Sequence, residues 1–407
     1  MTPDASATPS APERLSAPEL RNGLALSGVI FFRIVGLFML VPVLALYVDE
    51  IDGATPTLIG LAVGIYGLTQ ATFQIPMGAW SDRLGRKPVI VGGLTVFAIG
   101  SIVAAFATHI WVIILGRALQ GMGAVSSAVL ALAADLTRER QRTKINALIG
   151  ITFGGAFVVG MIAGPWINAV VALKGVFLTA ALCAAAAITI LLCLVASPEK
   201  RAQTGRTGMR WRQMPALFRH ERLLPLNLGV FALHFLITAA FLLIPLKLLK
   251  EVGTPAESHV WTYLPAMALS IVVLLPILAR SGRAAPGAGP HPGWITLLAV
   301  ISLSYLWPFV STTDAVVRIA LFFVAFNYLE AALPAMVSAA APDAEKGAAL
   351  GVYSSCQFAG AFLGGAVGGI ALDLMDRSGV ALACTAVTVV WLGIALAARA
   401  RGRPLPA

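Results

Sequence analysis

The sequence predicts an all-α membrane protein with about twelve transmembrane helices, arranged as two six-helix halves. Three observations lead to this fold class. Of the 407 residues, 58% are hydrophobic and 12% are charged, whereas soluble domains carry about 25% charged residues. Apolar runs of about 20 residues, the length that crosses a bilayer as a helix, recur from end to end. One long polar segment, 198–222, divides these runs into two groups of six.

The composition argues against several other classes of protein. The apolar runs are continuous rather than alternating, so the strands of a membrane β-barrel are not expected. The net charge of +10 is spread over short loops, which does not favour nucleic-acid binding. All four cysteines fall within apolar runs and none forms a CxxC pair, so we expect no disulfide and no metal site.

The first half is expected over residues 22–197, after a disordered cytoplasmic tail at 1–21. The tail is rich in Ala, Pro and Ser and lacks the apolar core of a signal peptide. Six spans separated by short polar links follow it. They are expected near residues 23–47, 56–80, 88–108, 110–134, 145–169 and 175–197.

Segment 198–222 is expected to be a cytoplasmic linker, because it is basic and is the longest internal break in hydrophobicity. The second half is expected over 223–400, followed by a short cytoplasmic tail at 401–407. Its six spans are expected near residues 223–249, 258–279, 293–312, 315–338, 347–372 and 379–399.

The distribution of Lys and Arg predicts the orientation of the chain. With a cytoplasmic N-terminus, 22 of the 29 Lys and Arg fall in inner segments, five in outer segments and two within spans. Cytoplasmic loops of multi-pass proteins carry such an excess of cations. We therefore expect a multi-pass protein of a cell inner (plasma) membrane, with both termini in the cytoplasm.

The link between the second and third spans has an unusual composition. Residues 78–88, GAWSDRLGRKP, pack one Asp, three cations and two glycines between long apolar runs. Glycine supplies the positive φ that a tight link needs, and the cations favour the cytoplasmic side. The positions of interest are Gly78, Asp82, Arg83, Gly85, Arg86 and Lys87.

Two arginines lie within predicted spans, where an ionisable group marks a pathway or a structural partner. Arg33 is about ten residues inside the first span, so we expect it to face a central cavity; the alternative is a structural ion pair. Arg117, with Gln120 one turn later, could tune a nearby carboxylate for proton coupling. The alternative for Arg117 is pairing with backbone carbonyls.

Glu330 is a carboxylate well inside a predicted span, and Asn327 precedes it on the same helical face. An apolar environment favours the neutral form of a carboxyl group, so Glu330 is the preferred candidate for a proton carrier. A buried structural Glu is the alternative. His234 titrates in a useful range, although a lone helical His is more often a neutral packing residue.

Neutral polar side chains within the spans have two possible roles, which the sequence does not separate. They could line a cavity, or they could join helices by hydrogen bonds. These residues are Gln70, Gln74, Asn146 and Gln357.

Small residues mark two predicted helices whose backbones can approach their neighbours closely. The fifth span carries Gly160 and Gly164, and Pro165 can bend it. The eleventh span carries Gly360 and Gly364.

These motifs make the chain resemble transporters of the major facilitator superfamily over nearly all of 22–400. The stretch 78–88 is similar to the family's loop between helices two and three. Arg117, Gln120 and Gly121 resemble its fourth-helix motif, and Gly160, Gly164 and Pro165 resemble its fifth-helix antiporter motif, with Asn168 and Ala169 in place of two glycines.

A closer resemblance is to the YajR-type group of proton-coupled drug-efflux proteins. The segments that carry it are RIVGLFMLVPVLALY, DLTRERQRTK, FNYLEAALP and GVYSSCQFAGAFLGG. The soluble C-terminal domain of the best-known members has no counterpart before the last residue, Ala407.

The resemblance implies secondary active transport. It implies proton-coupled export of small amphipathic or hydrophobic molecules by alternating access, in a monomer that needs no cofactor beyond the proton gradient. It also implies that Asp82 closes a cytoplasmic gate by binding the start of the eleventh helix near Gly347. In the same gate, Arg83 or Arg86 would pair with Asp135 at the inner end of the fourth span.

Other functions on the same fold stay open. A sugar or organic-anion facilitator or symporter is the nearest alternative, and a lipid flippase is another. An enzyme is disfavoured because the sequence shows no GxSxG or HExxH motif and its histidines are scattered.

Overall fold

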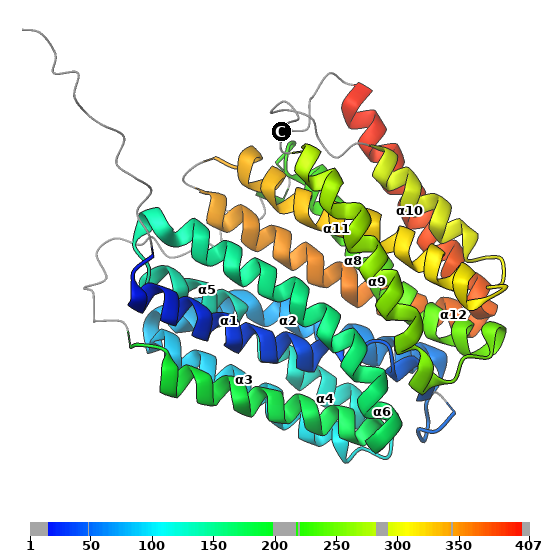
Figure 1. Cartoon of the computed structure of the whole chain (residues 1–407), viewed down its shortest axis with the longest axis horizontal. Helices are drawn as coiled ribbons and strands as arrows, with labels where there is room; N and C mark the ends of the chain where they lie inside the picture. Colours follow the sequence, from blue (N-terminus) through cyan, green and yellow to red (C-terminus); the bar gives the residue numbers. More distant parts are fainter. Residues whose placement is uncertain are drawn as a thin grey trace, which may run out of the picture.

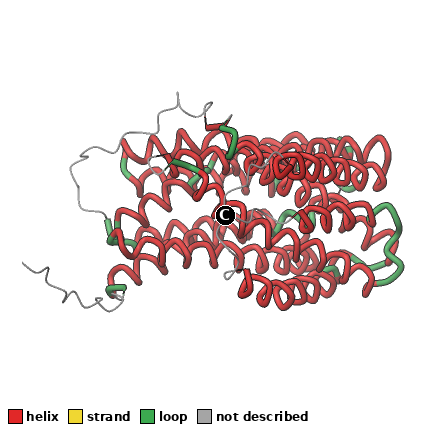
Figure 2. The backbone as a smooth tube through the Cα atoms, turned by 90° about the horizontal axis from the view of Figure 1, so that it is seen from above, coloured by secondary structure: helices red, strands yellow, loops and turns green. Residues whose placement is uncertain are grey.

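A computed structural model describes residues 15–47, 49–197, 217–218, 220–281, 292–342 and 345–400. Nearly all of this part of the chain is α-helix, and the helices lie roughly parallel or antiparallel to one another (Figure 2). Within it, nine helices are long and apolar enough to cross a membrane, and one further apolar helix is shorter. The all-helical membrane fold predicted from composition is therefore confirmed.

The first half contains six α-helices. They are α1 (Ala17–Phe38), α2 (Pro56–Leu84), α3 (Arg86–Ala105), α4 (Ile110–Met122), α5 (Ser126–Asp135) and α6 (Arg142–Leu194), with 3-10 turns η1 (Leu44–Tyr47) and η2 (Glu139–Gln141). Ser16 and Glu19 form a capping box that starts α1 within the expected tail, before residue 21. Gly85, with φ of 99°, separates α2 from α3 at the link where a glycine turn was expected.

The second half has the corresponding series of helices. They are α8 (Leu224–Lys247), the π-turn η4 (Leu248–Val252), η5 (Ala256–Ser258), α9 (Val260–Ser281), α10 (Pro292–Ser304), α11 (Thr312–Ala340) and α12 (Lys346–Ala400). Most of the expected linker 198–222 and all of the expected tail 401–407 lie outside the described residues.

Two helices are too long for a single crossing. At 53 and 55 residues, α6 and α12 each exceed twice the length of about 20 residues that spans a bilayer. Each contains a non-helical turn, at Val171–Ala172 in α6 and at Asp376 in α12, where the chain reverses. Figure 1 shows α6 doubling back in this way. If α6 and α12 count twice, α4 with α5 counts once and α10 is included, the described helices supply the expected twelve spans.

Buried apolar side chains form two clusters. One is built almost entirely from α1 to α6 and the other almost entirely from α8 to α12. The two groups of helices lie side by side in Figure 1, the first in blue to green and the second in yellow-green to red. Large apolar side chains such as Leu182 (69% exposed) and Val272 (66% exposed) face outward, as expected for a surface covered by lipid.

The closest contact between the halves joins α2 to α12 through their backbones. A Cβ added to Gly60 would lie 2.3 Å from the carbonyl oxygen of Gly365, and one added to Gly64 would lie 2.5 Å from that of Phe362. Only glycine permits so close an approach. At the same end, Thr57 Oγ1 donates to Asp373 Oδ2 at 2.7 Å.

The close backbone contacts of α2 lie in the part of the helix away from the link at Gly85. Phe157 and Met161, midway along the first crossing of α6, pack against the core of the second half. Closer to the start of α6, a Cβ added to Gly150 or Gly154 would meet no atom within 4 Å. The tightest backbone contacts between the halves therefore lie toward the end opposite the α2–α3 link.

Candidate functional site

Arg86 anchors the link between α2 and α3. Its Nε lies 3.0 Å from Asp135 Oδ2 at the end of α5, and its Nη1 donates to Ser81 Oγ at 2.7 Å. The same guanidinium forms an ion pair with Asp82, one turn earlier. Arg86 is thus the cation that the structure places on Asp135, one of the two pairings that the family resemblance implied.

The remaining positions of this link have different surroundings. Lys87 Nζ donates to the carbonyl oxygen of Val195 at 2.6 Å, which ties the start of α3 to the end of α6. Gly78 faces α5, and Arg83 is exposed. The expected contact between Asp82 and the first turn of α12 stays a prediction.

Arg33 is buried inside the first half, with 1% of its surface exposed. Its Nη2 donates to Gln70 Oε1 at 2.8 Å and to Tyr66 OH at 3.0 Å, and its Nη1 donates to Ser126 Oγ at 3.2 Å. Nη2 also lies 3.4 Å from the carbonyl oxygen of Gly123 at the break between α4 and α5, and this oxygen accepts from the backbone nitrogen of Val125 as well. The expectation that Arg33 faces an open cavity is wrong for this conformation, and its partners are neutral groups rather than the carboxylate of an ion pair.

Arg117 is also buried, at 2% exposure, and joins α4 to α2. Its Nε and Nη2 donate to the carbonyl oxygens of Ala62 and Val63 at 3.1 and 3.3 Å, and its Nη1 donates to Gln120 Oε1 at 2.8 Å. Gln120 Nε2 continues to Ser101 Oγ on α3 at 2.8 Å. These contacts fit the alternative of pairing with backbone carbonyls, and the partners of Arg117 within the described residues include no carboxylate.

A row of hydrogen bonds leads from Arg33 into the second half. Gln70, which accepts from Arg33, donates through Nε2 to Gln74 Oε1 at 3.3 Å. Gln74 Nε2 then donates to Ser354 Oγ on α12 at 3.0 Å. Of the two roles considered for these glutamines, joining helices is the one that the geometry shows.

In the second half, Glu330, His234 and Gln357 converge from α11, α8 and α12. Gln357 Nε2 lies 2.7 Å from His234 Nε2 and 3.3 Å from Glu330 Oε1, and the imidazole and carboxylate are 3.8 Å apart. Each helix supplies one member at a point well inside the membrane. Three residues that were predicted separately therefore form one polar cluster, which we call the α8–α11–α12 cluster.

The hydrogen bonds assign a tautomer to His234. A carbonyl oxygen can only accept, so Nδ1 carries the hydrogen in the 3.2 Å contact with the carbonyl oxygen of Val230. Nε2 of a neutral imidazole is then an acceptor, which suits the amide donor of Gln357. If His234 carried a second proton, its Nε2–H and the amide N–H of Gln357 would both be donors. The contact with Gln357 therefore depends on the protonation state of His234.

The carboxylate of Glu330 is only partly satisfied. Its Oε1 accepts from Gln357, whereas its Oε2 is buried and has no hydrogen-bond partner in the described part of the chain. A buried carboxylate oxygen without a partner is costly while it is charged. Asn327 lies half-buried one turn away on α11.

The four glycines that were predicted to pack helices lie at backbone contacts. A Cβ on Gly160 or Gly164 of α6 would lie 2.8 Å from Phe38 Cβ or 2.1 Å from the carbonyl oxygen of Met39. Gly360 and Gly364 of α12 lie in the same way against Phe231 and Phe235 of α8. Pro165 lies within the first crossing of α6, before the turn at Val171–Ala172.

The sequence did not predict a cluster of buried charged side chains in the second half, at the end where α12 turns at Asp376. Lys247, at 2% exposure, donates to Glu251 at 2.9 Å and to the carbonyl oxygen of Trp307 at 3.1 Å, and Arg377 lies 3.7 Å from Glu251. The spacing of Lys247 and Glu251, four residues apart, was the available signal. These contacts tie the end of α8 to the link between α10 and α11 and to the turn in α12.

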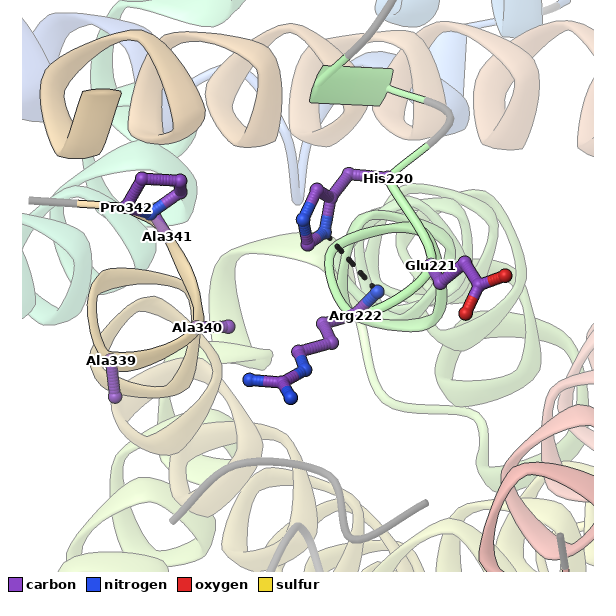
Figure 3. Close-up of a pocket in the computed structure, with 7 residues that line it drawn as sticks. All are labelled: His220, Glu221, Arg222, Ala339, Ala340, Ala341 and Pro342. Atoms are coloured by element: carbon purple, nitrogen blue, oxygen red, sulfur yellow. Dashed lines mark hydrogen bonds between the residues drawn. The ribbon is translucent and has the colours of Figure 1, made fainter. Parts of the chain in front are cut away.

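A cavity of about 790 Å³ lies at the opposite end of the second half. His220, Glu221 and Arg222 line one side and Ala339–Pro342 the other, and the backbone nitrogen of Arg222 donates to His220 Nδ1 at 3.3 Å (Figure 3). Glu330 precedes Ala339, a residue that lines the cavity, by nine residues on α11, so the two lie roughly 14 Å apart along the helix. The cavity is therefore distinct from the α8–α11–α12 cluster.

Comparisons with known proteins agree with the geometry. The family model described as Major Facilitator Superfamily matches residues 26–329. The inner membrane transport protein YajR of Escherichia coli (strain K12) is 40% identical over 382 residues, which cover 94% of this chain and 84% of YajR. The multidrug resistance protein MdtH of Yersinia enterocolitica is 29% identical over an alignment that covers 61% of this chain and 62% of MdtH.

The fold is shared with solved transporters. A bacterial homologue of the human lysosomal transporter Spinster, in an inward-facing and occupied conformation, superposes with a TM-score of 0.71. The alignment covers 94% of this chain and 96% of that protein at 13% sequence identity, so the likeness concerns the fold alone.

Proposed function

Because the chain belongs to the major facilitator superfamily, a family of membrane transporters rather than enzymes, we propose that it exports small amphipathic or hydrophobic molecules in exchange for protons. The observation that carries the proposal is the α8–α11–α12 cluster. It combines a half-satisfied intramembrane carboxylate with a histidine that shares one amide partner, Gln357, with it. Intramembrane groups of this kind mark proton relays in transporters.

The two-half architecture supports alternating access. Contacts at Thr57, Gly60 and Asp373 hold one end of the interface together, and we infer that the opposite end is the open one. With the cation-rich links in the cytoplasm, this conformation is open to the cytoplasm. Protonation of Glu330 would change its bonding to Gln357 and hence the balance between the two conformations, and the proton gradient would give the cycle its direction.

The names of two relatives support the location and the substrate class. YajR is described as an inner membrane transport protein, and MdtH as a multidrug resistance protein. We therefore extend to this chain an inner-membrane location and hydrophobic or amphipathic substrates. We further propose that it works as a monomer without a cofactor.

The test is proton movement in sealed proteoliposomes that contain a pH-sensitive dye. A panel of tetraphenylphosphonium, tetracycline, a sugar and an organic anion is added to wild type, Glu330→Gln and the control Glu257→Gln, whose carboxylate is exposed. We expect a lipophilic compound to release protons in wild type and in the control but not in Glu330→Gln. Solute entry without proton movement in all three proteins would overturn the exchanger.

One observation favours a second candidate, the transport of organic anions. Arg33 and Arg117 are buried cations whose hydrogen-bond partners are neutral, so the first half presents positive charge inside the membrane. Movement of the organic anion alone in the same panel would favour this candidate.

A further inference from the structure

The hydrogen bonds from Arg33 to Ser354 all run in one direction. A guanidinium only donates, so Gln70 must turn its oxygen toward Arg33 and is left to donate to Gln74. Gln74 in turn accepts from Gln70 and donates to Ser354. Aligned hydrogen bonds polarise and strengthen one another. The permanent charge of Arg33 therefore determines that Gln74 turns its amide nitrogen, a donor, toward Ser354 on α12.

Ser354 precedes Gln357 by three residues on α12, so the two lie about one turn apart on neighbouring faces of one rigid helix. Ser354 bonds to the first half, and Gln357 bonds to Glu330 and His234. The titratable groups that face Glu330 are His234 from α8 and Tyr353 from α12. One turn of α12 thus joins the contact between the halves to the candidate proton site.

We propose that Gln74 and Ser354 are positioning residues that couple protonation of the α8–α11–α12 cluster to the movement of the two halves. The proposal rests on the proposed function. When Glu330 takes up a proton, its bond to Gln357 loses the charge that strengthens it, and the local position of α12 changes with that weakening. The bond to Gln74 passes this change to α2, the helix through which the halves touch.

The bond is placed where movement between the halves must alter it. Gln74 lies beyond the close backbone contacts at Gly60, Gly64 and Gly67, toward the open end of the interface. When the two halves rock apart at the glycine contacts, this part of α2 tilts against α12. Because a hydrogen bond tolerates little change in distance or angle, its strength differs between the two conformations. A contact whose strength differs between the two conformations can couple protonation of the cluster to the movement of the halves.

The test uses the proton alone as ligand. Nitroxide labels on Glu50→Cys and Met375→Cys, both exposed at the closed end, report the distance between the halves once the exposed Cys193 is replaced by Ser. We expect acid to change the ratio of the two distance populations in wild type. In Ser354→Ala and Gln74→Leu both populations persist, but the acid-induced change falls by about three- to tenfold, the factor that one net hydrogen bond supplies.

Matched variants separate coupling from a general structural effect. Ser355→Ala removes the neighbouring hydroxyl, which bonds only to the carbonyl oxygen of Gly351 on its own helix, and should respond as wild type does. Ser354→Thr keeps a hydroxyl and should restore the response. The double variant Gln74→Leu/Ser354→Ala should lose no more than either single variant, because both remove the same bond.

The outcomes distinguish this inference from the function on which it rests. A wild-type response that Ser354→Ala retains in full would overturn the coupling role and leave the exchanger intact. A wild-type distribution that acid does not change, together with absent proton movement in the liposomes, would overturn both. Equal loss of response in Ser354→Ala and Ser355→Ala would identify a packing effect and would also overturn the inference.

Discussion

At the scale of single residues, Tyr66 organises the two buried arginines of the first half. Its hydroxyl accepts from Arg33 at 3.0 Å, and its ring lies 5.1 Å below the guanidinium of Arg117. A desolvated cation–π contact of this kind contributes about 2 kcal/mol. The two charges are thus held by neutral groups within one half, so both arginines stabilise the packing of α1, α2 and α4.

The three hydrogen bonds of the Arg117 guanidinium predict how its substitution changes the stability of the protein. Its three nitrogens bond to three acceptors, and a Lys ammonium cannot reach all of them in that geometry. We expect Arg117→Lys to destabilise the protein by about 2–4 kcal/mol, because buried acceptors lose their donors. The measurement is thermal unfolding in detergent. Arg140→Lys, at an exposed position, is the control and should unfold like wild type.

Individual site residues could be predicted, whereas their convergence could not. Glu330 and His234 are conspicuous because titratable groups are rare in apolar runs. Their meeting with Gln357 depends on the rotations of three helices, and hydropathy does not determine these rotations. The surroundings of Arg33 could not be predicted for the same reason: they include the carbonyl oxygen of Gly123, at the break between α4 and α5.

At the scale of elements, helix ends were the main source of error. The pattern Ser16-Ala-Pro-Glu19 is a capping-box signature, and it starts α1 earlier than the end of the tail expected from composition. The fourth span was expected to be continuous over 110–134 but breaks between α4 and α5. The span positions agree because bilayer thickness limits them, whereas local ends depend on single hydrogen bonds.

The backbone contact between α2 and α12 predicts a shift in conformation. Gly60→Ala would place a Cβ 2.3 Å from the carbonyl oxygen of Gly365, so the closed end must open. With labels on Glu50→Cys and Met375→Cys, we expect the population with the longer distance to increase. Gly92→Ala is the matched control, since its Cβ would meet no atom within 4 Å. An unchanged distribution in Gly60→Ala would show that the contact does not hold this end closed.

At the scale of the whole molecule, charge and hydropathy predicted the architecture well. The number of spans follows from apolar length, and each half builds its own apolar core. The relative position of the halves could not be predicted in this way, because a transporter occupies more than one arrangement with the same sequence. The conformation in hand depends on contacts such as Thr57 to Asp373, which join residues far apart in the chain.

The orientation of the chain is a prediction at this scale. Because cations are concentrated in the links on one side, we expect both termini in the cytoplasm. A fluorescent protein fused after Ala407 should fluoresce, and a phosphatase that is active only outside the cytoplasm should work when inserted after Gly253. The reverse result for both fusions would invert the topology and, with it, the direction in which this conformation is open.

The glycine contacts between α2 and α12 have one further consequence, for the energy supply of the cell. Where two backbones touch with no side chain between them, the gap is too narrow for a file of water molecules. Protons and small ions then have no hydrated path between these two helices. The seal limits leakage, so an energised membrane can hold many copies of such a protein without losing its voltage.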